Sequence, residues 1–174
     1  MYAYLRLATM VLKNTFRKKE VFDHTTSYVW TFRPGLADLD VYPEVNNGRH
    51  FVLFDLARYD LALRTGLFRW VRKTRSAFVV AGSTIRYRHR LRPWRRTQIL
   101  TELVGMDDRF FYFQQRTVQS GRTCSVALLR TGVRRKGAIH PQEVMKGMGI
   151  SIEPFMQSWV EAWNTWDDDR PWPE

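Results

Sequence analysis

Residues 47–65, NGRHFVLFDLARYDLALRT, carry apolar side chains on most sides of a predicted helix of about five turns. Asn46 or Asn47 is suited to cap the first turn of this helix, and Gly66 is suited to end the last turn. A helix that is apolar nearly all round must be covered over most of its surface. The pattern therefore predicts a long central helix that is largely buried.

The segments on either side of this helix read as strands. Residues 21–33 are rich in Thr, Val and aromatic residues, which favours a strand before the helix. Four strand-like segments follow it: 78–91, 97–105, 109–118 and 122–133. Their connections are short, which predicts that consecutive strands are antiparallel neighbours. Two further helices are expected near the C-terminus, at 141–147 and at about 154–166.

This order of elements predicts one α+β domain spanning residues 1–174. A single antiparallel sheet can bury such a helix only by curling about it, with something else covering the remainder. A second subunit is the simplest cover, so we expect a homodimer or a dimer of dimers. The sheet and central helix would occupy about residues 20–135, between an N-terminal amphipathic helix at 1–18 and a C-terminal helical extension at 141–174.

The formal net charge of +11 adds a preference for an anionic partner. Nucleic acid, acidic lipid and a phosphate-bearing small molecule all fit this charge. Nucleic acid is disfavoured, because the chain has no aromatic-and-basic RNA motif.

The apolar run in residues 1–19 is too short to span a bilayer. It could lie on a membrane surface with its basic end on lipid phosphates. A helix docked on its own domain or on a second subunit is the favoured alternative. No segment marks export, so a cytoplasmic location is expected, with peripheral membrane contact through residues 1–19 left open.

A single cysteine, Cys124, excludes an internal disulfide and any cysteine-rich metal site. The four histidines, at positions 24, 50, 89 and 140, have no ligand spacing. We therefore expect neither a metal nor a cofactor. Cys124 falls within a predicted strand, where a buried and inert thiol is expected.

The stretch DLDVYPEVNNGRHFVLFDLAR, residues 38–58, resembles the motif of hot-dog-fold thioesterases of the 4-hydroxybenzoyl-CoA thioesterase type. It is similar to the branch that also resembles plant acyl-ACP thioesterases and the thioesterase superfamily member 6 proteins. In that family an Asp-x-Asp pair precedes His, a small apolar residue, two Asn and the central helix, with an Ala/Gly-Arg pair further on. The residues that match in register are Asp38, Asp40, Val45, Asn46, Asn47, Ala57 and Arg58. The chain departs from the motif at Glu44, which replaces the family's His, while His50 occupies an aromatic position.

The resemblance implies a hot-dog fold and hydrolysis of acyl-CoA or acyl-carrier-protein thioesters. It carries the family's catalytic carboxylate over to Asp40, as general base or nucleophile. Family members often have an acid at the position of Asp55, which in some joins catalysis, and an ion pair with Arg58 is the equal alternative. Glu44 could serve as a second carboxylate, although a solvated loop residue is favoured. The alternative to an enzyme is a catalytically silent hot-dog protein that binds acyl groups or acts in assembly.

The polar loop in front of the helix has a chemical use that does not depend on the family. The first turn of a helix has unpaired N–H groups and a positive end, which together bind anions. Backbone N–H groups of Asn47 or Gly48 could therefore stabilise the oxyanion that forms when a thioester carbonyl is attacked. Gly48 would let a bulky acyl group approach the backbone, and Asn46 is expected to contact substrate.

The segment TIRYRHRLR, residues 84–92, carries arginine at every second position. Because strand side chains alternate between faces, four arginines are predicted to form a stripe on one face: Arg86, Arg88, Arg90 and Arg92. Guanidinium groups bind phosphate bidentately, so the stripe could hold CoA phosphates or the charged surface of a carrier protein. The alternative is a solvated outer face of the sheet.

Overall fold

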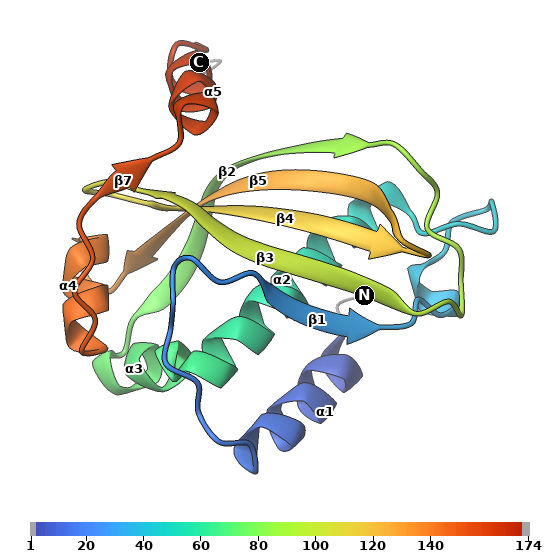
Figure 1. Cartoon of the computed structure of the whole chain (residues 1–174), viewed down its shortest axis with the longest axis horizontal. Coiled ribbons are helices and arrows are strands. Elements are labelled where there is room, and N and C mark those ends of the chain that lie inside the picture. Colours follow the sequence, from blue (N-terminus) through green and yellow to red (C-terminus); the bar gives the residue numbers. More distant parts are fainter. Residues whose placement is uncertain (1–2, 172–174) are drawn as a thin grey trace.

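The computed structural model describes residues 3–171, in which an antiparallel sheet curls over a long helix (Figure 1). The helices are α1 (Tyr4–Thr15), α2 (Asn47–Thr65), α3 (Leu67–Thr74), α4 (Pro141–Gly147) and α5 (Ser158–Asp168). The strands are β1 (Tyr28–Phe32), β2 (Ala77–Tyr87), β3 (Thr97–Met106), β4 (Phe111–Gln119), β5 (Arg122–Arg134), β6 (Ala138–Ile139) and β7 (Phe155–Met156). The predicted α+β architecture with a sheet curled about the central helix is confirmed.

Helix α2 has the predicted bounds because both of its ends are set by local chemistry. The Asn46 side chain accepts a hydrogen bond from the Gly48 N–H, and Gly66 ends the helix with a φ of 82°. Between these caps the apolar side chains of α2 lie against the inner face of the sheet. Its fully buried Phe54 and Leu56 belong to the same core cluster as Ile99 on β3.

The strand order is β1-β3-β4-β5-β2, with β7 beside β3 and β6 beside β5. The prediction that consecutive strands are neighbours is right for β3, β4 and β5 but wrong for β2 and β3. Strand β2 pairs with β5 at one edge, whereas β3 lies between β1 and β4. Residues 88–96 connect them across the N-terminal end of α2, where the Val45 N–H donates to the Leu91 carbonyl at 3.0 Å. Turn signals mark where a strand stops, but they do not say which sheet edge accepts the next strand.

Several predicted boundaries are wrong for local reasons. The strand expected at 21–33 is limited to β1, because the Asp23 carboxylate accepts hydrogen bonds that fold residues 23–26 into a turn. The strand expected at 78–91 ends at Tyr87. The helix expected from 154 begins at Ser158, because residues 155–156 pair with β3 instead. Helix α3 was not predicted, since it follows α2 directly after Gly66.

The terminal helices lie on opposite sides of the sheet. Helix α1, within the helix predicted at 1–18, packs beside α2, while α5 stands over the outer face of the sheet (Figure 1). Arg130 on β5 holds α5 by ion pairs with Asp167 at 2.9 Å and Asp168 at 2.8 Å. Residues 1–2 of the predicted N-terminal helix and 172–174 of the C-terminal extension lie outside the described residues. Between residues 3 and 171, no helix is long and apolar enough to cross a bilayer.

Candidate active site at the N-terminal end of α2

Asp38, the first acid of the motif, is a structural anchor. Its side chain is fully buried and accepts hydrogen bonds from Arg6 on α1 at 2.6 and 2.8 Å and from Arg49 on α2 at 3.1 Å. Burial alone would raise the pKa of Asp38, but hydrogen bonds from Arg6 and the Gly35 N–H outweigh burial and lower it. Asp38 therefore stays charged and ties α1 and α2 to the motif loop.

Asp40, the predicted catalytic carboxylate, lies half-buried in a tight loop that is fixed at both ends. The Asn46 N–H donates to the Asp38 carbonyl at 2.9 Å, which closes the loop at the start of α2. Within the loop, the Tyr42 N–H donates to Oδ1 of Asp40 at 2.8 Å. Among residues 3–171, Oδ2 of Asp40 accepts no hydrogen bond, so one carboxylate oxygen remains for other chemistry.

In the first turn of α2, one of the two predicted oxyanion donors already has a hydrogen-bond partner. The Gly48 N–H already donates to Oδ1 of Asn46 at 2.9 Å, and the Arg49 N–H donates to the Asn46 carbonyl at 2.9 Å. For the Asn47 N–H, no acceptor is found in the part of the chain that the structure describes. Asn47 is therefore the better placed donor, and the side chain of Asn46, predicted to contact substrate, serves as the helix cap.

Two residues that the motif analysis did not assign, Tyr87 and His50, support this turn. The Tyr87 hydroxyl donates to the Asn47 carbonyl at 3.1 Å, and its ring meets the His50 ring edge-on at 5.1 Å. His50 is buried, with Nδ1 3.0 Å from Oγ of Ser125 on β5. Burial lowers the pKa of His50 to about 4, so the ring is neutral near neutral pH. The only sequence signal for this support was a histidine at an aromatic position of the motif.

The two other candidate acids each have an arginine partner. Glu44 lies 2.9 Å from Nε of Arg90, whose side chain is 77% exposed, so this ion pair lies at the surface. Asp55 forms the predicted ion pair with Arg58, which also donates to Oε1 of the buried Gln115.

Asp55 is too far along α2 to act with Asn47 on one carbonyl of the same subunit. It follows Asn47 by eight residues, which is about 12 Å along a helix. A catalytic role for Asp55 stays a prediction, and it would require a carbonyl held elsewhere, such as one presented by a second subunit.

A small apolar cavity lies beside Asp55, between α2 and the sheet. It has a volume of about 180 Å³ and is lined mainly by apolar side chains of α2, β2 and β4, including Leu61, Phe78, Val80 and Phe113. This chemistry suits an acyl group. Asp55 and Arg58 are the charged residues of the lining.

The predicted stripe of four arginines on one strand face is wrong, because β2 ends at Tyr87 and the alternation stops there. Arg86 and Arg88 line a groove of about 1010 Å³ on the outer face of the sheet, together with Arg122, Trp159 and Trp163. Arg90 turns to Glu44 instead, and Arg92 lies in the 88–96 connection, where its N–H donates to Gln119. The groove also includes Tyr87, which contacts the first turn of α2. Across residues 3–171, no cluster of three or more His, Cys, Asp or Glu side chains could hold a metal ion.

Comparisons with known proteins agree with this architecture. The chain is 43% identical over 81 residues to Protein THEM6 of Xenopus laevis, covering 47% of this chain and 39% of that protein. It spans between 39% and 61% of the length of the curated relatives that it matches.

Solved structures share the fold at low sequence identity. YbaW, a probable thioesterase from Escherichia coli, is 22% identical with a TM-score of 0.63, over 70% of this chain and 96% of that one. SAV2348 from Staphylococcus aureus, solved in complex with CoA, is 9% identical with a TM-score of 0.64, over 89% and 94% of the two chains. These likenesses show the hot-dog fold alone. A family model matches residues 34–159, more than half of the sequence, and this chain therefore belongs to the Thioesterase-like superfamily.

Proposed function

We propose that this protein hydrolyses acyl-CoA thioesters, with Asp40 as the catalytic carboxylate. The observation that carries the proposal is the placement of Asp40 in a loop that is closed onto the first turn of α2. One oxygen of this carboxylate accepts no hydrogen bond from residues 3–171. The Asn47 N–H likewise finds no acceptor among these residues. A base and an oxyanion donor are the two groups that thioester hydrolysis requires.

The reaction follows from these two groups. The thioester carbonyl oxygen accepts a hydrogen bond from the Asn47 N–H at the positive end of α2. Asp40 removes a proton from water as the water attacks the carbonyl carbon, or it attacks that carbon itself to form an anhydride that water then opens. Negative charge on the carbonyl oxygen is stabilised by the Asn47 N–H, and the intermediate collapses with loss of the CoA thiolate. A thiolate leaves readily because the pKa of a thiol is only about 8.5.

Substrate recognition is proposed to use both faces of the sheet. Arg86, Arg88 and Arg122 offer guanidinium groups for the CoA phosphates in the outer groove, and Tyr87 connects that groove to Asn47. The apolar cavity beside Asp55 would take the acyl group. The CoA complex of SAV2348 supports a CoA-type ligand for this fold. An acyl-carrier protein remains the alternative donor of the thioester, because an acidic protein surface would also meet these arginines.

A two-fold dimer is proposed as the working form. Strand β2 pairs only with β5 among the described strands, and Val79 and Val80 on it are exposed, with Val80 in the lining of the apolar cavity. A second subunit that covers this edge would shield both valines and could bring its own Asp55 toward a bound thioester. Sedimentation at micromolar concentration should give a dimer or a multiple of it, and a monomer alone would contradict this part of the proposal.

The second candidate function is acyl binding without hydrolysis. It is favoured by one observation, namely that Glu44 stands where the family has His and is turned toward Arg90. A protein of this kind would bind acyl-CoA through the same groove and cavity but release no thiol.

Thiol release from a panel of acyl-CoA esters separates the two functions. We expect Asp40→Asn to lower turnover by about 100-fold or more, because the amide keeps the turn but is neither basic nor nucleophilic. Asp23→Asn is the matched control, since Asp23 also accepts a hydrogen bond from the N–H two residues on, at 2.8 Å, in a different loop. An active parent with an equally active Asp40→Asn variant would overturn the mechanism. A parent that cleaves no member of the panel would replace hydrolysis by acyl binding.

The other two acids are tested in the same assay. Glu44→Ala should cost much less than Asp40→Asn if Glu44 is only a partner of Arg90, whereas an equal loss would give Glu44 the role of the missing His. Asp55→Asn requires a parallel measurement of thermal unfolding, because loss of its ion pair with Arg58 could weaken α2 and imitate a catalytic defect.

A further inference from the structure

Helix α1 is apolar on two opposite sides, and only one side is covered. Met10 is buried on the inner side, next to the buried Asn14 and the core around α2. On the outer side, Leu5, Leu12 and Phe16 are 81%, 62% and 84% exposed. Their spacings of seven and four residues place them on one stripe of the helix. Three large apolar side chains exposed along one side of a helix are typical of an interaction surface.

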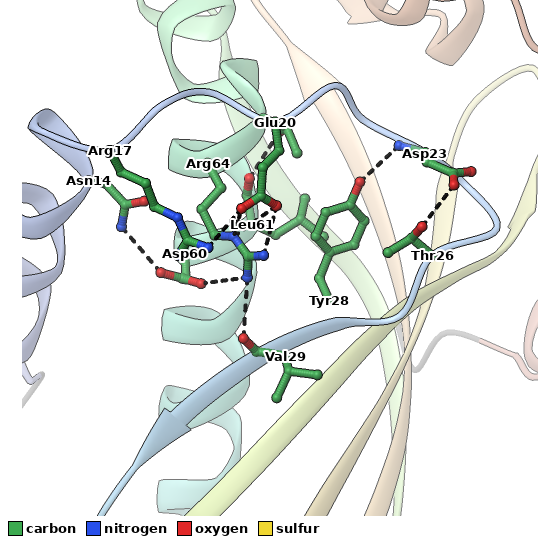
Figure 2. A network of polar contacts seen from close by, with 11 residues as sticks. Asn14, Arg17, Glu20, Asp23, Thr26, Tyr28, Val29, Asp60, Leu61 and Arg64 are labelled. Carbon is green, nitrogen blue, oxygen red and sulfur yellow. Dashed lines mark hydrogen bonds and ion pairs between the residues drawn. The ribbon is translucent and has the colours of Figure 1, made fainter.

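A buried polar network fixes which side of α1 faces outward. Figure 2 shows Asn14 of α1 donating to Asp60 of α2, at 3.2 Å, while Arg64 of α2 contacts both Asp60 and Glu20. Arg17, directly after α1, also reaches Glu20, at 2.8 Å.

Two further contacts hold the ends of the helix. Near its N-terminus Arg6 is bound to the buried Asp38, and just beyond its C-terminus the Lys19 ammonium donates to the Leu63 carbonyl at 2.8 Å. Rotating α1 to hide its outer stripe would leave Asp38 and Asp60 without these partners inside the protein, which is costly. The exposed stripe is therefore a fixed feature of the fold.

The segments that form this surface are basic, and the next acid along the chain, Glu20, is ion-paired with Arg17 and Arg64. Residues 3–19 contain five basic residues and no acidic one, and residues 67–75 contain four basic residues and no acidic one. Helix α3 lies near α1, and a groove of about 840 Å³ between them is lined by Val11 and Thr15 of α1 and by basic residues of α3. Those residues of α3 are Arg69, Arg72 and Lys73.

We propose that this surface, the outer stripe of α1 with the basic residues of α3, docks on an anionic lipid bilayer. Helix α1 would lie in the plane of the interface, with Leu5, Leu12 and Phe16 at the boundary between headgroups and acyl chains. Lys18, just after α1, and the arginines of α3 would contact lipid phosphates. The proposal does not depend on the proposed activity, since no residue of the α2 first turn takes part.

Charge selects lipid over a second copy of the chain as the occupant. In a two-fold contact each patch meets its own copy, so the cations of α1 and α3 would face cations with no acid between them. A bilayer with anionic lipid complements both parts of the surface. Docking by this side also leaves the outer groove accessible, because α5 lies on the far side of the sheet from α1 (Figure 1), and Trp159 and Trp163 of α5 line the groove.

Co-sedimentation of the full chain with vesicles tests the proposal. We expect binding to vesicles of phosphatidylcholine and phosphatidylglycerol to be at least about tenfold tighter than to phosphatidylcholine alone, and to weaken as salt is raised. The double variant Leu12→Gln/Phe16→Gln should lower partitioning by at least about tenfold, because it removes the inserted apolar area. Arg69→Gln/Arg72→Gln should lower binding to the anionic vesicles only.

Each variant has a matched control that should bind as the parent does. Trp159→Gln/Trp166→Gln removes two exposed tryptophans from α5, on the other side of the sheet, and Arg95→Gln/Arg96→Gln removes the same charge from the 88–96 connection. An equal loss in the two arginine variants would reduce the effect to net charge, and an equal loss in the two apolar variants would reduce it to exposed apolar area anywhere on the protein. Either result would overturn the proposal. Failure of the parent to bind anionic vesicles would also overturn it. So would dissociation of an oligomer by Leu12→Gln/Phe16→Gln in the absence of lipid, since a second copy would then cover the stripe.

Discussion

The backbone N–H of Gly48 donates to Oδ1 of Asn46 at 2.9 Å, so the first turn of α2 is capped by a residue of the motif itself. The Asn47 N–H, in contrast, finds no acceptor among residues 3–171. The two asparagines therefore differ in role: Asn46 stabilises the helix end, whereas the Asn47 N–H is the group proposed to bind an oxyanion.

Asn46→Ala should lower the free energy of unfolding by about 1 kcal/mol, because the helix loses its cap. For a chain of this length the melting temperature should fall by about 2–4 °C. Asn46→Asp keeps the cap and should retain stability, while its negative charge beside the Asn47 N–H should lower turnover. Thermal unfolding and thiol release on both variants check these outcomes, and equal stability losses in the two would rule out the cap.

Asp38→Asn should destabilise the protein by about 3 kcal/mol or more at pH 7, since two arginines lose a buried anionic partner. The pKa of Asp38 is lowered in the folded state, so its stabilisation is present above the ordinary carboxyl pKa and is lost as pH falls through the lowered value. The gap between parent and variant in urea unfolding should therefore close in acid. A gap of the same size at pH 7 and pH 2 would contradict this account.

His50→Phe should change how stability depends on pH. The pKa of His50 falls from 6.5 to about 4 on folding, so the unfolded chain binds a proton first, and stability declines as pH drops between these values. This decline amounts to about 3 kcal/mol for His50. The His50→Phe variant should therefore lose less stability than the parent between pH 7 and pH 4. His89 is exposed, so the control His89→Gln should lose as much stability as the parent. Unfolding midpoints measured from pH 7 to pH 4 provide the test.

Arg86→Gln/Arg88→Gln should raise KM for CoA esters by about tenfold or more and leave kcat nearly unchanged. Phosphate contacts far from the carbonyl hold ground state and transition state alike, which lowers KM without raising kcat. Arg92→Gln/Arg95→Gln removes the same charge outside the groove and serves as the control. If KM rises equally in both variants, the CoA phosphates are held by the general field and not by the groove.

The parts of the fold that follow from neighbouring residues were predictable from sequence. Helix α2 was predicted with its bounds because its caps, Asn46 and Gly66, lie next to the residues that they cap. The ion pair between Asp55 and Arg58 was one of two equal alternatives for Asp55, and it could be considered from sequence because a spacing of three on a helix brings side chains together.

Contacts between distant residues were not predictable. Nothing near Asp38 indicates that Arg6, thirty-two positions earlier, binds it from another helix. The position of β3 between β1 and β4 likewise depends on the whole sheet. The same holds for the contact between Tyr87, at the end of β2, and Asn47. The arginine stripe failed because alternation holds only while a strand lasts, and β2 ends before Arg88.

Chemical labelling of Cys124 can report local opening of the sheet. Cys124 is the only cysteine in the sequence, it is buried, and burial raises the pKa of its thiol. Alkylating reagents attack the thiolate, so labelling requires the start of β5, where Cys124 lies, to separate from its neighbours. The labelling rate at fixed pH therefore measures how often this part of the sheet opens, with no engineered probe and no competing thiol.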